Sequence, residues 1–175
     1  MTTEKTKKIT MTALMAALVF ACTFAVRIPN PMTGGYSHLG DCMIFLAVII
    51  LGRKYGAFAA AIGGALSDTL AGAAVWILPT FCIKFIMAFI MGSVILALHE
   101  RKHAALLGAV LGGIFQIAAY TLAKVVLIGW KVAILSVPNV SIQTAVGVVL
   151  FVVLSKLLAK PITRVTFVRK EGSRG

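Results

Sequence analysis

The feature that most constrains the fold is a series of six apolar runs, separated by short breaks rich in Pro, Gly and basic residues. The runs cover about residues 9–26, 39–51, 55–73, 77–98, 104–128 and 140–159. A membrane-spanning helix needs about 20 residues, so 175 residues hold six spans and no additional soluble domain. We therefore expect an all-α membrane protein of six transmembrane helices, with residues 1–170 as a single domain. Residues 171–175 are treated as a tail, for which a cloning remnant is one interpretation.

The second run is shorter than a full span and follows a loop, 28–37, that is rich in Pro, Gly and Ser. Its length is compatible with a helix that starts below the membrane surface, under that loop. Pro79 is expected in the first turn of the fourth helix, where proline is tolerated best. Gly129 and Pro138 frame a partly apolar connection before the last helix.

Composition excludes several classes of protein. Hydrophobic residues make up 60% of the chain and charged residues 13%, whereas soluble domains have about 45–50% and about 25%. An ordinary cytosolic enzyme, a disordered basic tail and a typical nucleic-acid-binding protein are therefore excluded. The basic start of the chain resembles a signal peptide, but the first run is long and lacks a small-x-small cleavage site, so we expect a retained span.

The three cysteines lie within or beside apolar runs, and no metal-binding spacing such as CxxC or HExxH occurs. We interpret the cysteines as packing residues. We expect no metal, no cofactor and no catalytic residues.

Basic residues give the chain a formal net charge of +12. Cytoplasmic loops of membrane proteins are enriched in Lys and Arg, and with six spans both termini lie on one side. Thirteen of the 17 basic residues fall on that side, which predicts cytoplasmic N- and C-termini: Lys5, Lys7, Lys8, Arg53, Lys54, Arg101, Lys102, Lys156, Lys160, Arg164, Arg169, Lys170 and Arg174.

Ionisable residues inside a membrane are costly, and each is a candidate functional residue. In the six-span arrangement these residues gather in the outer half of the spans, beneath the loop 28–37. A channel would spread polar residues through the whole thickness, so we expect a binding cup open to the outside. The candidate substrate-binding residues are Tyr36, His38, Asp41, Asp68, Trp76, Lys84, Gln116, Tyr120, Lys124, Asn139 and Gln143.

Helical spacing supports the cup. Gln116, Tyr120 and Lys124 recur every four residues and so share one helix face. Asp68 and Lys84 lie at similar depth on consecutive helices, and we expect them to pair. Asp68 and Lys84 each belong to a stripe of mostly small residues spaced four apart, which allows close helix packing. The stripes are Gly56, Ala60, Gly64 and Asp68 in one helix, and Thr80, Lys84, Ala88 and Gly92 in the next.

Some of these residues have structural interpretations that the sequence leaves open. An Asp68–Lys84 pair can fix helix packing without touching a ligand. Trp76 is also typical of the aromatic belt at a membrane interface, and His38 is more typical of a loop or cap than of a metal ligand.

The first run repeats the pattern Ala-x-x-x-Ala through Ala13, Ala17 and Ala21. Such a stripe gives a smooth helix face that a second helix can approach closely. The sequence leaves open whether that second helix belongs to this chain or to a partner.

The central part of the chain resembles the substrate-binding S components of energy-coupling factor (ECF) vitamin transporters, most closely the hydroxymethylpyrimidine and pyridoxine branch. The resemblance covers most of the chain and is strongest over 34–92. It rests on the order of short motifs: Gly34-Gly35-Tyr36-Ser37-His38-Leu39-Gly40-Asp41, Leu51-Gly52-Arg53-Lys54-Tyr55-Gly56, Gly63-Gly64-Ala65-Leu66-Ser67-Asp68, and Pro79-Thr80 with Lys84.

The resemblance implies a protein that binds a vitamin outside and associates with a transmembrane coupling subunit (T component) and two cytoplasmic ATPases. It implies reorientation of the S component in the membrane, with Ala13, Ala17 and Ala21 as the docking face for the coupling subunit. The chain has no GxxxxGK[ST] phosphate loop, so separate subunits must hydrolyse ATP.

Other functions remain as alternatives. An S component for riboflavin, folate or pantothenate would share the same outline. A stand-alone carrier or channel would need inverted repeats or polar residues along the full depth. A membrane enzyme would need a nucleophile with a base, a metal cluster or a carboxylate pair.

Overall fold

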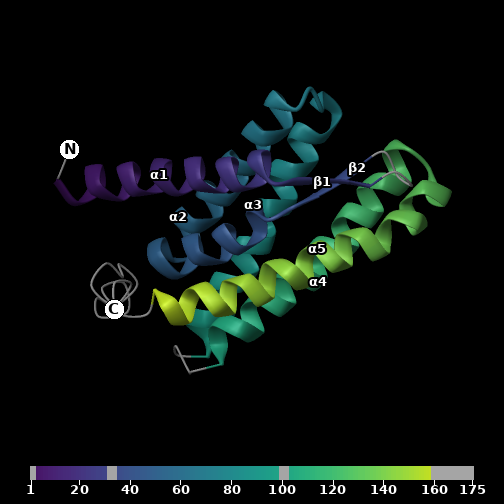
Figure 1. Ribbon diagram of the computed structural model, residues 1–175. Helices are drawn as coiled ribbons and strands as arrows, with labels where there is room; N and C mark the ends of the chain where they lie inside the picture. Colours follow the sequence, from purple (N-terminus) through teal and green to yellow (C-terminus); the bar gives the residue numbers. More distant parts are fainter. Residues whose placement is uncertain (1–2, 31–34, 99–102, 159–175) are drawn as a thin grey trace.

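The computed structural model describes residues 3–30, 35–98 and 103–158, which form a bundle of long helices (Figure 1). Among these residues, five helices are long and apolar enough to cross a membrane. A two-stranded hairpin separates the first two helices. The elements are α1 (Thr3–Ala25), β1 (Arg27–Asn30), β2 (Gly35–His38), α2 (Gly40–Leu70), α3 (Ala74–Ala97), α4 (Ala104–Leu127) and α5 (Trp130–Leu157).

The predicted second and third helices form one element, α2, which is interrupted at Gly52. Gly52 has φ 79° and ψ 179°, a conformation that essentially only glycine adopts. The chain folds back there. The close approach of Gly56 to Val48 shows this, since a Cβ atom on Gly56 would lie only 2.7 Å from the Cα of Val48. Residues eight apart in a continuous helix are separated by about 12 Å along its axis. The predicted break at Gly52 is therefore present, although the described residues form five helices and not six.

The loop predicted over 28–37 contains the β-hairpin, so the chain is not purely α-helical. β1 and β2 pair antiparallel, with Arg27 opposite His38 and Asn30 opposite Gly35. The two strands of a short hairpin satisfy each other's backbone hydrogen bonds. The Pro- and Gly-rich composition of this segment predicted a loop and did not indicate this strand pairing. β2 leads directly into the first turn of α2 and contacts α5.

Two predicted helix starts and the predicted place of Pro79 are wrong. α1 begins at Thr3 and not near residue 9, and α3 begins at Ala74, so Pro79 is inside the helix and not in its first turn. α5 begins at Trp130, ten residues early, and contains Pro138. We had treated proline as a boundary, but neighbouring helices can compensate for its missing N–H in a membrane-spanning helix. Gly129, with φ 112°, turns the chain between α4 and α5.

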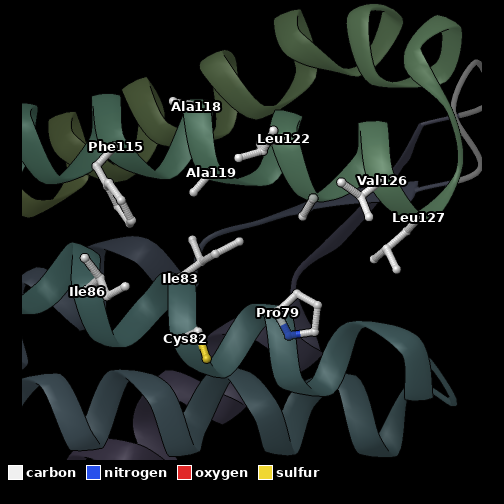
Figure 2. A pocket seen from close by; sticks show the side chains of 11 residues that line it. Pro79, Cys82, Ile83, Ile86, Phe115, Ala118, Ala119, Leu122, Val126 and Leu127 are labelled. Atoms are coloured by element: carbon white, nitrogen blue, oxygen red, sulfur yellow. The ribbon is translucent and has the colours of Figure 1, made fainter.

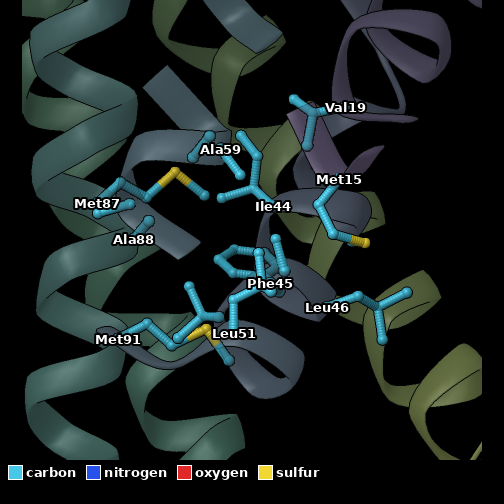
Figure 3. Packing of buried hydrophobic residues seen from close by; sticks show 14 of the residues in the cluster. Met15, Val19, Ile44, Phe45, Leu46, Leu51, Ala59, Met87, Ala88 and Met91 are labelled. Carbon is cyan, nitrogen blue, oxygen red and sulfur yellow. The ribbon is translucent and has the colours of Figure 1, made fainter. Parts of the chain in front are cut away.

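The apolar core lies where α1, α2 and α3 meet (Figure 3). Met15 and Val19 of α1 face Ile44 and Phe45 of α2, and Met87 of α3 closes the other side. All five side chains are buried. This core fixes the first half of α2, which carries the first polar residue of the site described below.

Glycines bring α3 close to its two neighbours. A Cβ atom on Gly108 or Gly112 of α4 would lie 2.8 or 2.7 Å from the carbonyl oxygen of Met91 or Met87 in α3. On the other side of α3, a Cβ atom on Gly92 would lie 2.7 Å from the Cα of Arg53. Gly92 belongs to the stripe predicted in α3, and this stripe therefore does allow close helix packing.

The outer surface of the bundle is apolar. Leu78, Val126 and Leu157 are each more than 70% exposed, which suits a surface covered by lipid chains. The first turn of α1 and the last turn of α5 lie at the same end of the molecule, and the hairpin and the α4–α5 connection lie at the other end (Figure 1).

Candidate functional site

The centre of the site is a buried polar cluster of Asp41 from α2, Lys84 from α3 and Gln116 from α4. The Lys84 ammonium binds Asp41 Oδ1 at 2.5 Å and donates a second hydrogen bond to Gln116 Oε1. Gln116 Nε2 donates to Asp41 Oδ2 at 2.7 Å. Asp41 and Gln116 are fully buried and Lys84 is 2% exposed. The three side chains thus form a closed ring of hydrogen bonds joining three helices.

α5 completes the cluster with two adjacent side chains. Gln143 Nε2 donates to Asp41 Oδ2 at 3.2 Å, and Thr144 Oγ1 accepts a hydrogen bond of 2.8 Å from Gln116 Nε2. Buried polar groups are costly unless they are hydrogen-bonded. The four helices that contribute these groups therefore support one another at this point.

Backbone geometry explains why Asp41 can reach the cluster. Asp41 lies in the first turn of α2, where the helix dipole stabilises a negative charge. Lys84 and Gln116 lie near the middle of α3 and α4, so α2 begins deep within the bundle. This agrees with the prediction of a second helix that starts below the surface. The cluster lies about midway along α3 and α4, deeper than the outer half that we expected.

Glycine residues create the space for the cluster. A Cβ atom on Gly147 of α5 would lie 2.7 Å from the Cβ of Asp41, and one on Gly113 of α4 would lie 2.5 Å from a methyl group of Thr144. Gly64 of α2 lies in the same way against Thr80 and Lys84. The polar side chains are therefore held by tight backbone packing as well as by hydrogen bonds.

An aromatic pair lies next to the cluster. Trp76 of α3 and Tyr120 of α4 have ring centroids 6.3 Å apart, and the Lys84 ammonium lies 5.5 Å from the centroid of the Tyr120 ring. Tyr120 donates a hydrogen bond of 3.2 Å to Thr80 Oγ1. Both aromatic side chains are only partly buried, so they lie between the buried cluster and the surface.

His38 connects the hairpin to the cluster. Its Nδ1 accepts a hydrogen bond of 3.2 Å from the Gly40 backbone N–H, so a neutral ring carries its proton on Nε2. That nitrogen lies 3.4 Å from Gln143 Nε2. The prediction of His38 as a cap residue therefore fits its contact with Gly40, and its place beside Gln143 also puts it next to the site.

The remaining predicted residues lie around the cluster or outside the described part. Asp68 is buried near the end of α2, and Asn139 is partly buried in α5. Lys124 is partly buried in the last turn of α4. Tyr36 lies in β2 opposite Pro29, and its side chain lies outside the described part of the structure.

Sequence reasoning paired Lys84 with the wrong carboxylate. The ion pair that the structure gives to Lys84 is with Asp41, 43 residues away, and not with Asp68. We compared depths along full spans, whereas α2 begins at mid-depth and brings Asp41 to the level of Lys84. Only the shortness of the second apolar run indicated this.

Two residues in contact with the cluster were missed. Thr144 follows Gln143 directly, but a threonine in an apolar helix gives little sequence signal. Gly147 lies four residues after Gln143 on the same helix face, and its close approach to Asp41 is visible only in three dimensions.

Two apolar grooves lie on the outside of the bundle. One, of about 600 Å³, lies between α3 and α4, where Pro79, Ile83, Phe115, Ala119 and Leu122 form part of its lining (Figure 2). The other, of about 490 Å³, lies between α1 and α2. Its α1 wall includes Ala13 and Ala17 of the Ala-x-x-x-Ala stripe, and these two alanines and Ala21 are exposed.

Within the described ranges, no group of three or more His, Cys, Asp or Glu side chains is placed to hold a metal ion. The cluster offers one carboxylate, one ammonium and two carboxamides, which suit recognition of a polar ligand by hydrogen bonds and charge. The cluster is surrounded by helices that are long and apolar enough to cross a membrane.

Comparison with known proteins places the chain in a family. Residues 3–160 match the family model of the S component of ECF-type riboflavin transporters, and the chain belongs to this S-component family. Members are membrane-embedded transporter components for vitamin uptake and not enzymes, and they work with a T component and ATPases. An uncharacterised protein of Pyrococcus woesei is 35% identical over 144 residues, which are 82% of this chain and 96% of that protein.

Proposed function

We propose that this protein is the high-affinity binding component for a small heteroaromatic vitamin or vitamin precursor, of the hydroxymethylpyrimidine or pyridoxine class. The observation that carries this proposal is the ring formed by Asp41, Lys84 and Gln116 beside the Trp76–Tyr120 pair. An apolar site with a few fixed polar groups is typical of small-molecule binding.

A planar ring fits this arrangement in two ways. Trp76 and Tyr120 supply aromatic faces for stacking, and Asp41 and Lys84 supply a charged acceptor and a charged donor for ring substituents. The side chains of Tyr120 and His38 are only partly buried, so a ligand reaches the cluster by displacing the aromatic pair or the end of the hairpin. Gln143 and Asn139 of α5 complete the wall of the proposed site, with Asp68, Lys124 and Tyr36 as outer contacts.

Riboflavin is the second candidate, because the matching family model is described by that vitamin. Its three-ring system is much larger than a pyrimidine or a pyridine. Titration of the purified protein with both classes distinguishes them, and folate and pantothenate complete the panel. Binding of none of these vitamins would refute the proposal.

Transport then requires partners. We propose that the chain docks on the T component through Ala13, Ala17 and Ala21 and reorients in the membrane, powered by two cytoplasmic ATPases. The termini lie on the cytoplasmic side in this proposal. Reaction of an engineered Lys131→Cys with an impermeant thiol reagent in intact cells, after Cys22, Cys42 and Cys82 are replaced by Ala, tests that orientation. Absence of labelling before lysis would contradict it.

The binding site is tested by substitution. Lys84→Ala, Asp41→Ala and Asp68→Ala are each expected to weaken vitamin binding at least tenfold, a loss of about 1.4 kcal/mol or more. Isothermal titration in detergent measures this, with the exposed Lys54→Ala as the control. Wild-type affinity in the Lys84 and Asp41 variants would refute the site, whereas wild-type affinity in Asp68→Ala alone would remove only that residue.

A further inference from the structure

The cluster holds the Gln116 carboxamide in a specific way. Its amino group donates to Asp41 Oδ2 at 2.7 Å, and its carbonyl oxygen accepts from the Lys84 ammonium. Asp41 Oδ1 and Lys84 close the ring at 2.5 Å. The ion pair therefore binds both ends of one planar group, with the carboxylate on the donor and the ammonium on the acceptor.

The group that is bound in this way has a definite chemical pattern. In a carboxamide, an N–H donor and an oxygen acceptor are attached to the same carbon atom. A ring N–H beside a carbonyl group has the same pattern, as does an amino group on the carbon next to a ring nitrogen. Each of these groups therefore presents one donor and one acceptor side by side, which we call an amide- or amidine-type edge. An ion pair that binds one such edge can also bind the other two.

We propose that Asp41 and Lys84 recognise an amide- or amidine-type edge of the substrate, which takes the place of the Gln116 carboxamide. The inference rests on the proposed function and narrows its substrate class. Charged partners make these hydrogen bonds stronger than neutral ones. Gln116 has three side-chain torsions, so its carboxamide can turn aside. Thr144 Oγ1 already accepts a hydrogen bond from Gln116 Nε2, and it remains a partner for the Gln116 carboxamide after the exchange.

The two candidate vitamin classes then separate by chemistry. A 4-aminopyrimidine has an amino group next to a ring nitrogen, and riboflavin has a ring N–H between two carbonyl groups. In pyridoxine the ring hydroxyl group is on a carbon atom that is not bonded to the ring nitrogen, so pyridoxine lacks the edge. We therefore expect this protein to bind an aminopyrimidine or a flavin in preference to pyridoxine.

Matched ligand pairs test the proposal on the unmodified protein. The first pair is 4-amino-5-hydroxymethyl-2-methylpyrimidine and its analogue without the amino group, and the second is riboflavin and 3-methylriboflavin. The parent compound that binds is expected to bind at least tenfold more tightly than its partner in titration calorimetry, a discrimination typical of hydrogen bonds to charged groups. Equal affinity within the pair would overturn the inference, as would preferential binding of pyridoxine.

Substitutions separate the exchange from a direct role of Gln116. Gln116→Ala is expected to retain the discrimination within the ligand pair, because Asp41 and Lys84, which bind the edge, are both still present. Asp41→Asn, which keeps the size of the side chain, is expected to reduce the discrimination. Thr144→Val is the matched control for loss of one hydrogen bond in the cluster, and it is expected to retain the discrimination.

The outcomes of these titrations also distinguish the proposed vitamin-binding site from the proposed recognition of an amide- or amidine-type edge. If Lys84→Ala and Asp41→Ala abolish binding but the ligand pairs bind equally, the site stands and the edge recognition is wrong. If Gln116→Ala alone abolishes binding of the parent compound, Gln116 contacts the ligand directly and the exchange is wrong. If neither parent compound nor pyridoxine binds, both the substrate class and the inference are refuted. If pyridoxine alone binds, the substrate class stands and the inference is refuted.

Discussion

At the scale of single residues, the Asp41–Lys84 ion pair is a costly feature of the molecule. Both charges are removed from water, which costs several kcal/mol per ion before their attraction and hydrogen bonds compensate. Asp41 accepts from Lys84, Gln116 and Gln143, and Lys84 donates to Asp41 and Gln116. Such complete pairing is what allows the charges to be buried at all.

Removing one partner of this pair is expected to destabilise the protein more than neutralising both. Lys84→Met leaves a buried carboxylate without its cation and should cost roughly 3–5 kcal/mol. The double variant Lys84→Met with Asp41→Asn should recover at least half of that loss, although it should not bind the vitamin. Thermal unfolding in detergent compares the three proteins. A double variant that is less stable than Lys84→Met would contradict this account of the pair.

Gly147 is expected to be a positioning residue for the site. A Cβ atom there would lie 2.7 Å from the Cβ of Asp41, so Gly147→Ala must displace the carboxylate and should weaken vitamin binding about tenfold or more. Gly108→Ala is the matched control, because its Cβ atom would meet Met91 at 2.8 Å, away from the cluster.

The control variant should lose stability, by about 1–3 kcal/mol for an overpacked contact, and keep its affinity. Titration and thermal unfolding of both variants separate the two effects. Similar affinity in the two variants would contradict the positioning role.

At the scale of elements, the sequence was informative about breaks and less so about starts. Gly52-Arg53-Lys54 predicted the point where α2 folds back, because a glycine followed by two charges cannot continue an apolar run. Pro138 predicted a boundary that does not exist, since α5 passes through it. Helix continuity there depends on neighbouring helices, which a single segment of sequence does not contain.

The candidate site was also predicted unevenly. Lys84 and Gln116 were identified because polar residues in long apolar runs are rare. Their connection to Asp41 could not be predicted, because it depends on the depth at which α2 begins. Gly147 gave no signal, because a glycine in a membrane-spanning helix is common and its role depends on the residue that it faces.

The exposed stripe on α1 is expected to act in docking and not in vitamin binding. Ala13→Trp with Ala17→Trp would fill the groove between α1 and α2 and should abolish co-purification with the T component and the ATPases. Leu18→Trp is the control, because Leu18 is exposed on α1 but does not line the groove. Vitamin affinity should be unchanged in both variants. An intact complex with the double variant would contradict the docking face.

At the scale of the whole molecule, many large apolar side chains are exposed on the outside, whereas the polar cluster of Asp41, Lys84 and Gln116 is buried inside. Asp41 and Lys84 are buried and neutralise each other, so the reorientation that we propose would not expose these two charges to lipid. The cluster joins α2, α3, α4 and α5, so these four helices are expected to move together. Family membership establishes the role in vitamin uptake, and the cluster is our proposal for how the vitamin is bound.

The central claim is that Asp41 and Lys84 hold a heteroaromatic vitamin. Mass spectrometry of small molecules extracted from the purified protein tests it most directly, with the double variant Lys84→Met and Asp41→Asn purified in parallel. We predict about one vitamin molecule per wild-type chain, carrying an amide- or amidine-type edge, and none in the variant. Equal amounts of the same vitamin in both proteins, or no heteroaromatic molecule in the wild type after growth with the candidate vitamins, would contradict the account.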